Sequence, residues 1–409
     1  MTGPRCRLCD EVLSHIVVDL GVCPLANSFV TAERLSQPEV SHPLRAWVCG
    51  TCFLVQVEGF EDPKDLFSRY PYFSSISQSW LRHAEAYAHM ATSRFDLNED
   101  SKVIEVASND GYLLQYFKAR GVPVLGIEPA GNVAETAKAR DIPTEVAFFG
   151  KTTAQSLRAV GHAADLMPAN NVLAHVPDIV DFLDGFRILL KSHGVATFEF
   201  PHLLPTIVEG QFDQICQEHL SYLSLGVVTE SLRKSDLRVF DVERLPTHGG
   251  SLRVFVCHAE GPNVERQTVS ALLAEERRAG LYKLETYSRF AERAASIKCD
   301  VLDFLISVRR EGKTVCGYGA AGKATTFLNY CGIGPELLRV VADRNPHKQN
   351  TWFPGRHIPV VTPEAMLTMR PDYVLILAWN LKDEVAGELA LIREWNGSFV
   401  TAIPELSIF

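Results

Sequence analysis

Four cysteines near the start of the chain form two closely spaced pairs. They read Cys6-x-x-Cys9 and Cys49-x-x-Cys52. Two residues between the members of a pair let both thiolates bind one ion, and two such pairs complete the tetrahedral shell that zinc prefers. Because four thiolates leave no open position, we expect a structural zinc site rather than a catalytic one. The alternatives are two unrelated thiol pairs or a redox pair.

A short turn of small and polar residues follows the apolar run 103–106. It reads Ser108-Asn109-Asp110-Gly111, and small residues let a ligand approach the backbone at the end of a strand. A second apolar run ends at Glu128, where a carboxylate can hydrogen-bond both hydroxyls of a ribose. The first turn lacks the Gly-x-Gly-x-x-Gly that a pyrophosphate needs, which favours a ligand without phosphate over a dinucleotide.

The run from Glu105 to Gly111 resembles the first motif of S-adenosylmethionine-dependent methyltransferases. That motif commonly has glycine where Ala107 and Asn109 stand in this chain. A further strand ends at Asn170, at the edge where such enzymes face their substrate. The alternative is a sheet of the same kind without a ligand. The expected methyl-donor site comprises Glu105, Ala107, Ser108, Asn109, Asp110, Gly111, Glu128, Asn170 and Asn171.

Strands that alternate with helices run through most of the chain and predict parallel, doubly wound sheets. We expect an α/β protein with three parts: a zinc-binding module at 1–70, a Rossmann-like S-adenosylmethionine domain at 71–262, and a helical linker with a smaller Rossmann-like α/β domain at 263–409. Pro168 weakens the prediction for the strand that contains it. The expected strands lie at 46–48, 53–57, 103–106, 122–127, 164–170, 194–200, 313–318, 340–343 and 373–378, and the expected helices at 75–95, 112–119, 130–140 and 264–310.

The composition limits the class of protein. The chain has 409 residues, of which 46% are hydrophobic and 22% charged, as in globular proteins of two to three domains. No apolar run approaches the ~20 residues of a membrane span, and the N-terminus has no apolar signal region. The net charge of −9 argues against nucleic acid as a partner. We therefore expect a cytoplasmic protein, monomeric or dimeric, with reduced cysteines, no membrane partner and a small-molecule substrate.

Segments along nearly the whole chain resemble one family, the three-domain sugar C-methyltransferases of antibiotic deoxysugar pathways. Besides the cysteine pairs and the donor motif, they are Pro24-Leu25-Ala26-Asn27, Asn171-Val172-Leu173-Ala174-His175, Glu199-Phe200-Pro201-His202, Glu218-His219-Leu220-Ser221-Tyr222, His248-Gly249-Gly250-Ser251-Leu252-Arg253, Gly317-Tyr318-Gly319-Ala320 and Ala378-Trp379-Asn380. The resemblance implies zinc and S-adenosylmethionine as bound groups. It also implies a C-terminal domain that helps to enclose a nucleotide-diphosphate-linked keto deoxysugar, such as a thymidine-diphosphate sugar.

Methylation of a sugar carbon needs an activated nucleophile. A carbon becomes nucleophilic next to a carbonyl once a base removes its α-proton and donors hold the enolate oxygen. A histidine with a pKa near neutral suits the base, and a neighbouring carboxylate can orient its ring. Glu218-His219 supplies these two residue types, and the family places its candidate base and partner here. We expect His219 to be the base and Glu218 its partner.

The chain departs from the family at this place. The family motif reads Tyr-His-Glu-His, whereas this chain reads Cys216-Gln217-Glu218-His219. The tyrosine is a catalytic candidate in the family, and Cys216 is shorter and a weaker hydrogen-bond donor. Either His219 still serves as the base for a different acceptor, or the reaction itself has changed. For Cys216 we weigh a nucleophile against a plain substitution.

Further polar residues match positions around the family's substrate site. Tyr70 and His175 are expected catalytic residues, with packing between domains and a capping or core role as their alternatives. The turn that begins at Gly319 is expected to cradle a diphosphate, with Lys323 neutralising its charge, against the alternative of a solvated lysine. The expected substrate-binding residues are Cys216, Tyr222, His248, Gly319 and Lys323, of which His248 has a turn residue as its alternative.

Three functions are consistent with these residues. The favoured one is S-adenosylmethionine-dependent C-methylation next to the ketone of a nucleotide-linked sugar. A second function keeps the fold and the donor but changes the acceptor or the reaction, because Cys216-Gln217 departs from the family. A third is a zinc-dependent binding protein without catalysis, against which the presence of Glu218 and His219 argues.

Overall fold

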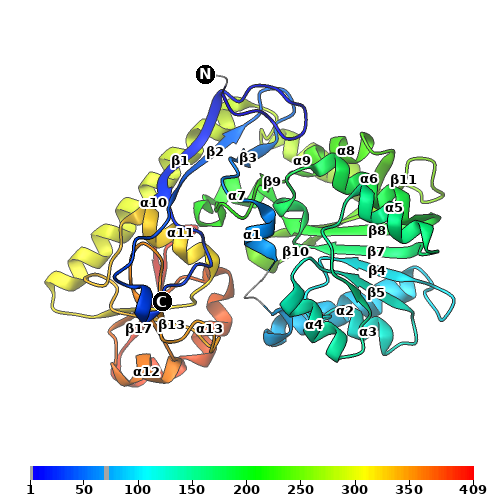
Figure 1. Cartoon of the computed structure of the whole chain (residues 1–409). Helices are drawn as coiled ribbons and strands as arrows, with labels where there is room; N and C mark the ends of the chain where they lie inside the picture. Colours follow the sequence, from blue (N-terminus) through cyan, green and yellow to red (C-terminus); the bar gives the residue numbers. More distant parts are fainter. Residues whose placement is uncertain (1–2, 69–72) are drawn as a thin grey trace.

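The computed structural model describes residues 3–68 and 73–409, so Tyr70 lies outside the described residues. Three β-sheets follow one another along the chain (Figure 1). The central domain lies on the right of Figure 1, the C-terminal domain at the lower left, and the N-terminal sheet above them. The prediction of an α/β protein with three parts is confirmed. Among the described residues, no helix is both long enough and apolar enough to cross a bilayer.

The N-terminal sheet is antiparallel, and its last strand comes from a distant part of the chain. Its order is β1 (His15–Cys23), β2 (His42–Val48), β3 (Val55–Val57) and β9 (Ser221–Tyr222). Val55 of β3 pairs with Tyr222 of β9, so the sheet holds the loop that carries Glu218 and His219. The short helix α1 (Pro63–Phe67) follows β3 and is capped by the side chain of Asp62.

One predicted strand begins later than the sequence indicated. The expected strand at 53–57 starts only at Val55. Phe53 has a φ of 61°, which is incompatible with extended backbone, and it closes the turn after the second cysteine pair. The geometry of the cysteine turn therefore overrides the apolar alternation at this end of the strand.

The central sheet has seven strands, all parallel except β11, which runs antiparallel to both neighbours. Such a sheet is buried on both faces, and its strands are accordingly rich in continuous apolar residues. Its order is β10 (Leu237–Leu245), β11 (Ser251–His258), β8 (Leu190–Pro201), β7 (Ala164–Asn170), β4 (Val103–Val106), β5 (Val124–Ile127) and β6 (Thr144–Glu145).

Strand β7 forms in spite of Pro168. Pro168 pairs with Thr197 of β8. On the β4 side the pairing is limited to Val103 and Leu166, so the missing N–H of Pro168 leaves that short ladder intact. The predicted strand at 164–170 is therefore present.

Helices cover both faces of the central sheet. Successive strand residues point to opposite faces, so Ile104 and Val106 of β4 join one apolar cluster and Val103 joins the other. The first cluster lies under α5 (Lys151–Ala159), α6 (Ile179–Leu189) and α8 (Leu225–Arg233), and the second under α2 (Gln78–Arg94), α3 (Leu114–Lys118) and α4 (Gly131–Ala139). Helix α7 (Leu203–Glu209) follows β8.

Two helices occupy the segment 264–310, which the sequence predicts to be helical. They are α9 (Gln267–Arg278) and α10 (Leu284–Arg310), separated by a turn at Gly280, which has a φ of 85°. Helix α10 buries residues at spacings of three and four, among them Phe290, Ala294 and Ile297. These residues belong to one apolar cluster with β1 and with the C-terminal domain, so α10 joins the two parts (Figure 1).

The C-terminal domain is a smaller α/β unit with a parallel centre and antiparallel edges. Its sheet has the order β14 (Thr351–Trp352), β15 (Pro359–Val361), β13 (Val341–Ala342), β12 (Val315–Tyr318), β16 (Tyr373–Ile376), β17 (Ser398–Thr401) and β18 (Ser407–Ile408). Its helices are α11 (Gly322–Cys331), α12 (Pro363–Thr368) and α13 (Lys382–Glu388). A Gly-rich turn joins the central strand β12 to α11, as the sequence predicted.

Candidate functional site

The four cysteines of the two pairs converge. Their sulfur atoms all lie within 4.8 Å of one another, with Cys6 and Cys52 3.5 Å apart and Cys9 and Cys49 also 3.5 Å apart. A tetrahedral zinc ion with Zn–S bonds of about 2.3 Å separates its sulfurs by about 3.8 Å, so the four thiolates fit zinc. The two pairs have the same turn, since the residue after each has a φ of 61°.

The donor motif keeps the backbone of a glycine-rich turn without the glycines. Ala107 has a φ of 57° and Asn109 a φ of 48°, both in the left-handed region that glycine adopts most easily. On the neighbouring strand β5, a Cβ at Gly126 would stand 2.3 Å from Oγ of Ser108. Glycine at 126 therefore lets the loop that follows β4 lie close against β5.

Hydrogen bonds to the buried carboxylate of Glu128 fix the backbone of this loop. Glu128 accepts hydrogen bonds from the backbone N–H of Asn109 at 2.8 Å and of Ala130 at 2.9 Å. Asn109 accepts one from the backbone N–H of Ser74 at 2.9 Å, which places the segment before α2 against the loop. Burial raises the pKa of Glu128 and raises that of Glu105 well above its ordinary value.

Several buried polar atoms at this edge have no hydrogen-bond partner within the part of the chain that the structure describes. They are Oε2 of Glu105, Oγ of Ser108, and Oδ1 of Asp110, Asn170 and Asn171. They lie at the carboxyl ends of β4 and β7, which are neighbours in the sheet. Buried polar atoms are nearly always satisfied in proteins, so this edge fits a polar ligand such as the amino-acid and ribose parts of S-adenosylmethionine.

Two histidines meet beside the loop before β9. The rings of His175 and His219 lie 4.8 Å apart at an angle of 72°. Nδ1 of His175 is 2.7 Å from the backbone oxygen of Glu218, and Nδ1 of His219 is 3.3 Å from that of Gln214. A carbonyl can only accept, so each Nδ1 carries the proton and each Nε2 keeps its lone pair.

The two imidazoles differ in basicity. Burial lowers the pKa of His175 to about 3, and the neighbouring His219 contributes to that shift. Burial also lowers the pKa of His219, but the carboxylate of Glu218 opposes it. His219 is therefore the more basic of the pair.

The carboxylate of Glu218 is held by the N-terminal part of the chain. Nδ2 of Asn27 lies 3.1 Å from each of its oxygens, across 191 residues of sequence. Burial raises the pKa of Glu218, while Asn27 and the charge of Lys348 from the C-terminal domain lower it. Among the described residues, Glu218 makes no side-chain hydrogen bond to the ring of His219, so it acts on that ring through its charge. The sequence did not single out Asn27 as a site residue, and only its place in the Pro24–Asn27 segment of the resemblance pointed to it.

A hydrogen bond joins Cys216 and Tyr222 within this loop. The hydroxyl of Tyr222 accepts a hydrogen bond from the backbone N–H of Cys216 at 3.0 Å. Burial and the charge of Glu218 raise the pKa of the Cys216 thiol to about 12. The thiolate is the nucleophilic form of cysteine, so the environment of Cys216 favours the plain substitution over a nucleophile.

A cavity of about 210 Å³ adjoins this cluster between the N-terminal and central parts. Arg7 and Phe67 line it from the N-terminal part, and His175 and Glu218 from the central part. The ring of Phe67 lies 5.5 Å from that of His175. An acceptor in this cavity would contact His175 and Glu218.

Lys323 and His248 lie where the C-terminal domain meets the central one. Nζ of Lys323 hydrogen-bonds to Asn380 and lies 4.1 Å above the ring of Trp379, whose indole N–H donates to Asp213 at 2.7 Å. Burial lowers the pKa of Lys323 to about 8, and Asp213 opposes the shift.

Burial lowers the pKa of His248 to about 4, and the charges of Lys323 and His219 act on it too. Gly319, with a φ of 95°, forms the turn before α11.

The structure thus gathers the expected residues in three places. The cysteines form the metal site, the donor residues line the edge of β4, β5 and β7, and His175, Cys216, Glu218, His219 and Tyr222 form one cluster. His248 of the central domain and Lys323 of the C-terminal domain lie at the boundary between the two domains, and the charge of His219 acts on His248.

Comparison with known proteins assigns the chain to a family. Residues 6–67 match a zinc binding domain, 80–242 a methyltransferase domain, and 246–404 the C-methyltransferase C-terminal domain. The chain is 34% identical over 401 residues to the C-methyltransferase NovU of Streptomyces niveus, across 98% of this chain and 96% of that one. The chain belongs to this C-methyltransferase family. It is an S-adenosylmethionine-dependent enzyme with a four-cysteine zinc site.

Distant solved structures resemble part of this C-methyltransferase. The magnesium protoporphyrin IX methyltransferase of Synechocystis is 12% identical and covers 44% of this chain and 79% of its own, with a TM-score of 0.34. A methyltransferase from Mesorhizobium loti is 14% identical and covers 42% of this chain and 99% of its own, also with a TM-score of 0.34.

Replacing one zinc ligand is expected to release the metal. In Cys49→Ser the shell has three thiolates, so we expect loss of bound zinc and a lower melting temperature, because the metal holds both cysteine turns. Metal analysis and thermal denaturation measure the two effects. Cys299→Ser is the matched control, since Cys299 is exposed and outside the metal site. Full zinc content with an unchanged melting temperature in Cys49→Ser would contradict the assignment.

Proposed function

We propose that this enzyme methylates a nucleotide-diphosphate-linked keto deoxysugar at the carbon next to the ketone. The resemblance to deoxysugar C-methyltransferases over nearly the whole chain supports this acceptor. The observation that carries the proposal is the position of the proton on the ring of His219. One ring nitrogen donates to the backbone oxygen of Gln214, and the other keeps its lone pair beside a buried carboxylate.

His219 acts as the base in the proposed reaction. Its Nε2 takes the α-proton of the keto sugar and leaves an enolate. The imidazolium that forms is stabilised by the charge of Glu218, which Asn27 holds in place. S-adenosylmethionine, when bound, supplies an electrophilic methyl group to the enolate carbon.

His175 and Tyr70 complete the proposed catalytic set. His175 has a pKa of about 3, so it stays neutral and does not compete for the proton. Its hydrogen bond to the backbone oxygen of Glu218 positions the residue next to the base. Tyr70, the other expected catalytic residue, lies outside the described residues.

The nucleotide end of the acceptor is proposed to lie at the C-terminal domain. The turn from Gly319 and the cation of Lys323 stand at the carboxyl end of β12, where α/β sheets bind ligands. The Asp213–Trp379 hydrogen bond fixes this domain against the central one, at the residues just before Cys216. The diphosphate would therefore approach Lys323 while the sugar reaches His219.

Mass spectrometry of the reaction products tests the proposal. The enzyme is incubated with S-adenosylmethionine and a panel of thymidine-diphosphate keto sugars, with His219→Asn beside it. We expect a product heavier by one methylene with the unaltered enzyme and none with the variant, because asparagine cannot take the proton. His258→Asn is a control for histidine loss on strand β11, away from the cluster.

Two other outcomes would change the proposal. A methylated product that persists in His219→Asn would move the base to another residue, with His175 the nearest. If no sugar is methylated while S-adenosylmethionine still binds, the proposed acceptor is wrong. The second function, with a different acceptor or reaction, would then be favoured, with Cys216 and Gln217 as its origin.

The affinity for the acceptor is expected to fall above pH 8. The pKa of Lys323 is about 8, so its charge is present below that pH and is lost as the pH rises through it. We expect KM for the nucleotide sugar to rise between pH 7 and pH 9, and KM of Lys323→Met to be high and flat over this range. The exposed Lys382→Met serves as the control. A KM of the unaltered enzyme that does not change with pH would contradict the role of Lys323.

A further inference from the structure

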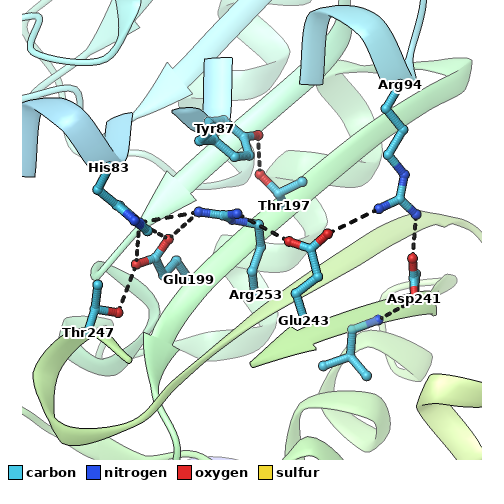
Figure 2. A network of polar contacts seen from close by, with 10 residues as sticks. His83, Tyr87, Arg94, Thr197, Glu199, Asp241, Glu243, Thr247 and Arg253 are labelled. Carbon is cyan, nitrogen blue, oxygen red and sulfur yellow. Dashed lines mark hydrogen bonds and ion pairs between the residues drawn. The ribbon is translucent and has the colours of Figure 1, made fainter. Parts of the chain in front are cut away.

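A second imidazole–carboxylate pair joins helix α2 to strand β8, apart from the His175–His219 cluster. Nε2 of His83 is 2.9 Å from both oxygens of Glu199, near the end of β8 (Figure 2). None of the Glu199 side chain is exposed. Arg253 of β11 donates to the same carboxylate at 2.8 Å, so a buried guanidinium matches its charge.

A chain of ion pairs holds this arginine in place. Nη1 of Arg253 lies 3.2 Å from Glu243, which also pairs with Arg94 at 3.6 Å (Figure 2). The guanidinium of Arg253 stacks 4.5 Å from the ring of Tyr87, whose hydroxyl lies 2.6 Å from that of Thr197. Arg253 is therefore held by Glu243 and Tyr87, and it in turn fixes the carboxylate of Glu199.

The hydrogen bonds of His83 determine which ring nitrogen carries its proton. Nε2 faces two carboxylate oxygens at 2.9 Å and one donor, Nη2 of Arg253, at 3.3 Å. The nearer acceptors place the proton on Nε2. Nδ1 then has a lone pair, and within the described parts of the chain no group donates to it. The His83 side chain is 20% exposed, so part of the ring is accessible to a ligand.

The carboxylate that holds His83 is separated from the donor loop in the central sheet. Glu199 is on β8, whereas the donor loop follows β4 on the other side of β7. The ring of Trp80 lies 4.9 Å from His83 and 5.8 Å from His248. The charges of both His83 and His219 lower the pKa of His248, so the three imidazoles are close enough to interact electrostatically.

We propose that His83 binds the acceptor: its Nδ1 accepts a hydrogen bond from a hydroxyl of the sugar. The partner must be a hydroxyl because a neutral imidazole nitrogen with a lone pair needs a donor, and a ketone oxygen has no hydrogen to give. Glu199 and Arg253 are positioning residues that hold the ring. This inference rests on the proposed function, and it adds that the keto sugar carries a free hydroxyl on the side away from His219.

Steady-state kinetics with two acceptors test this inference. One acceptor is a thymidine-diphosphate keto sugar that the enzyme methylates, and the other is its analogue lacking the hydroxyl. The variant His83→Gln keeps a nitrogen donor near the Nε2 position for Glu199 but has no lone pair at the Nδ1 position. The matched control is His89→Gln, an exposed histidine on the same helix.

We expect His83→Gln to lower kcat/KM for the hydroxylated sugar about tenfold, the value of one neutral hydrogen bond. KM should account for most of the loss, and the affinity for S-adenosylmethionine should not change. The analogue that lacks the hydroxyl should have the same kcat/KM with the unaltered enzyme and with His83→Gln. Even without the variant, the unaltered enzyme should prefer the hydroxylated sugar by about the same factor.

The inference fails if the unaltered enzyme does not distinguish the two acceptors. It also fails if His83→Gln matches the unaltered enzyme, or if it loses activity equally on both acceptors together with S-adenosylmethionine affinity, as a structural role predicts. If the unaltered enzyme methylates no keto sugar at all, the proposed function has failed, and the assignment of His83 fails with it.

Discussion

The proposed acceptor site depends on the buried carboxylate of Glu218. A charge removed from water is unfavourable unless partners surround it, and each part of the chain supplies one. Asn27 comes from the N-terminal part, His219 from the central part, and the charge of Lys348 from the C-terminal domain. No single part of the chain thus supplies all the partners of Glu218, the neighbour of the proposed base.

The zinc site contributes to the position of the loop that carries Glu218 and His219. It fixes the two cysteine turns, and the second turn leads into β3, which pairs with β9 directly after the loop of Glu218 and His219. A structural metal thus helps to position the loop that carries the proposed base. On the other side, the hydrogen bond between Asp213 and Trp379 sets the position of the same loop against the C-terminal domain.

The sequence predicted the elements of this enzyme better than the contacts between them. The cysteine pairs, the donor turn and the alternating strands and helices are local patterns, and each reports its own chemistry or burial. Ala107 and Asn109 looked like departures from the donor motif, yet both adopt the left-handed backbone of the glycines they replace, at a strain of about 1–2 kcal/mol each. The contact of Asn27 with Glu218 and the pairing of the two-residue strand β9 join segments far apart in sequence, and no periodicity reports such partners. His83 was missed for the same reason, because its partner Glu199 lies 116 residues away.

The most direct measurement of the central claim separates proton removal from methyl transfer. The enzyme is placed in deuterium oxide with the keto sugar and S-adenosylhomocysteine, which has no methyl group to give, and deuterium at the carbon next to the ketone is followed by mass spectrometry. Enolisation by His219 predicts that the unaltered enzyme introduces deuterium, while His219→Asn binds the sugar and does not. Exchange at the same rate in His219→Asn would contradict the account.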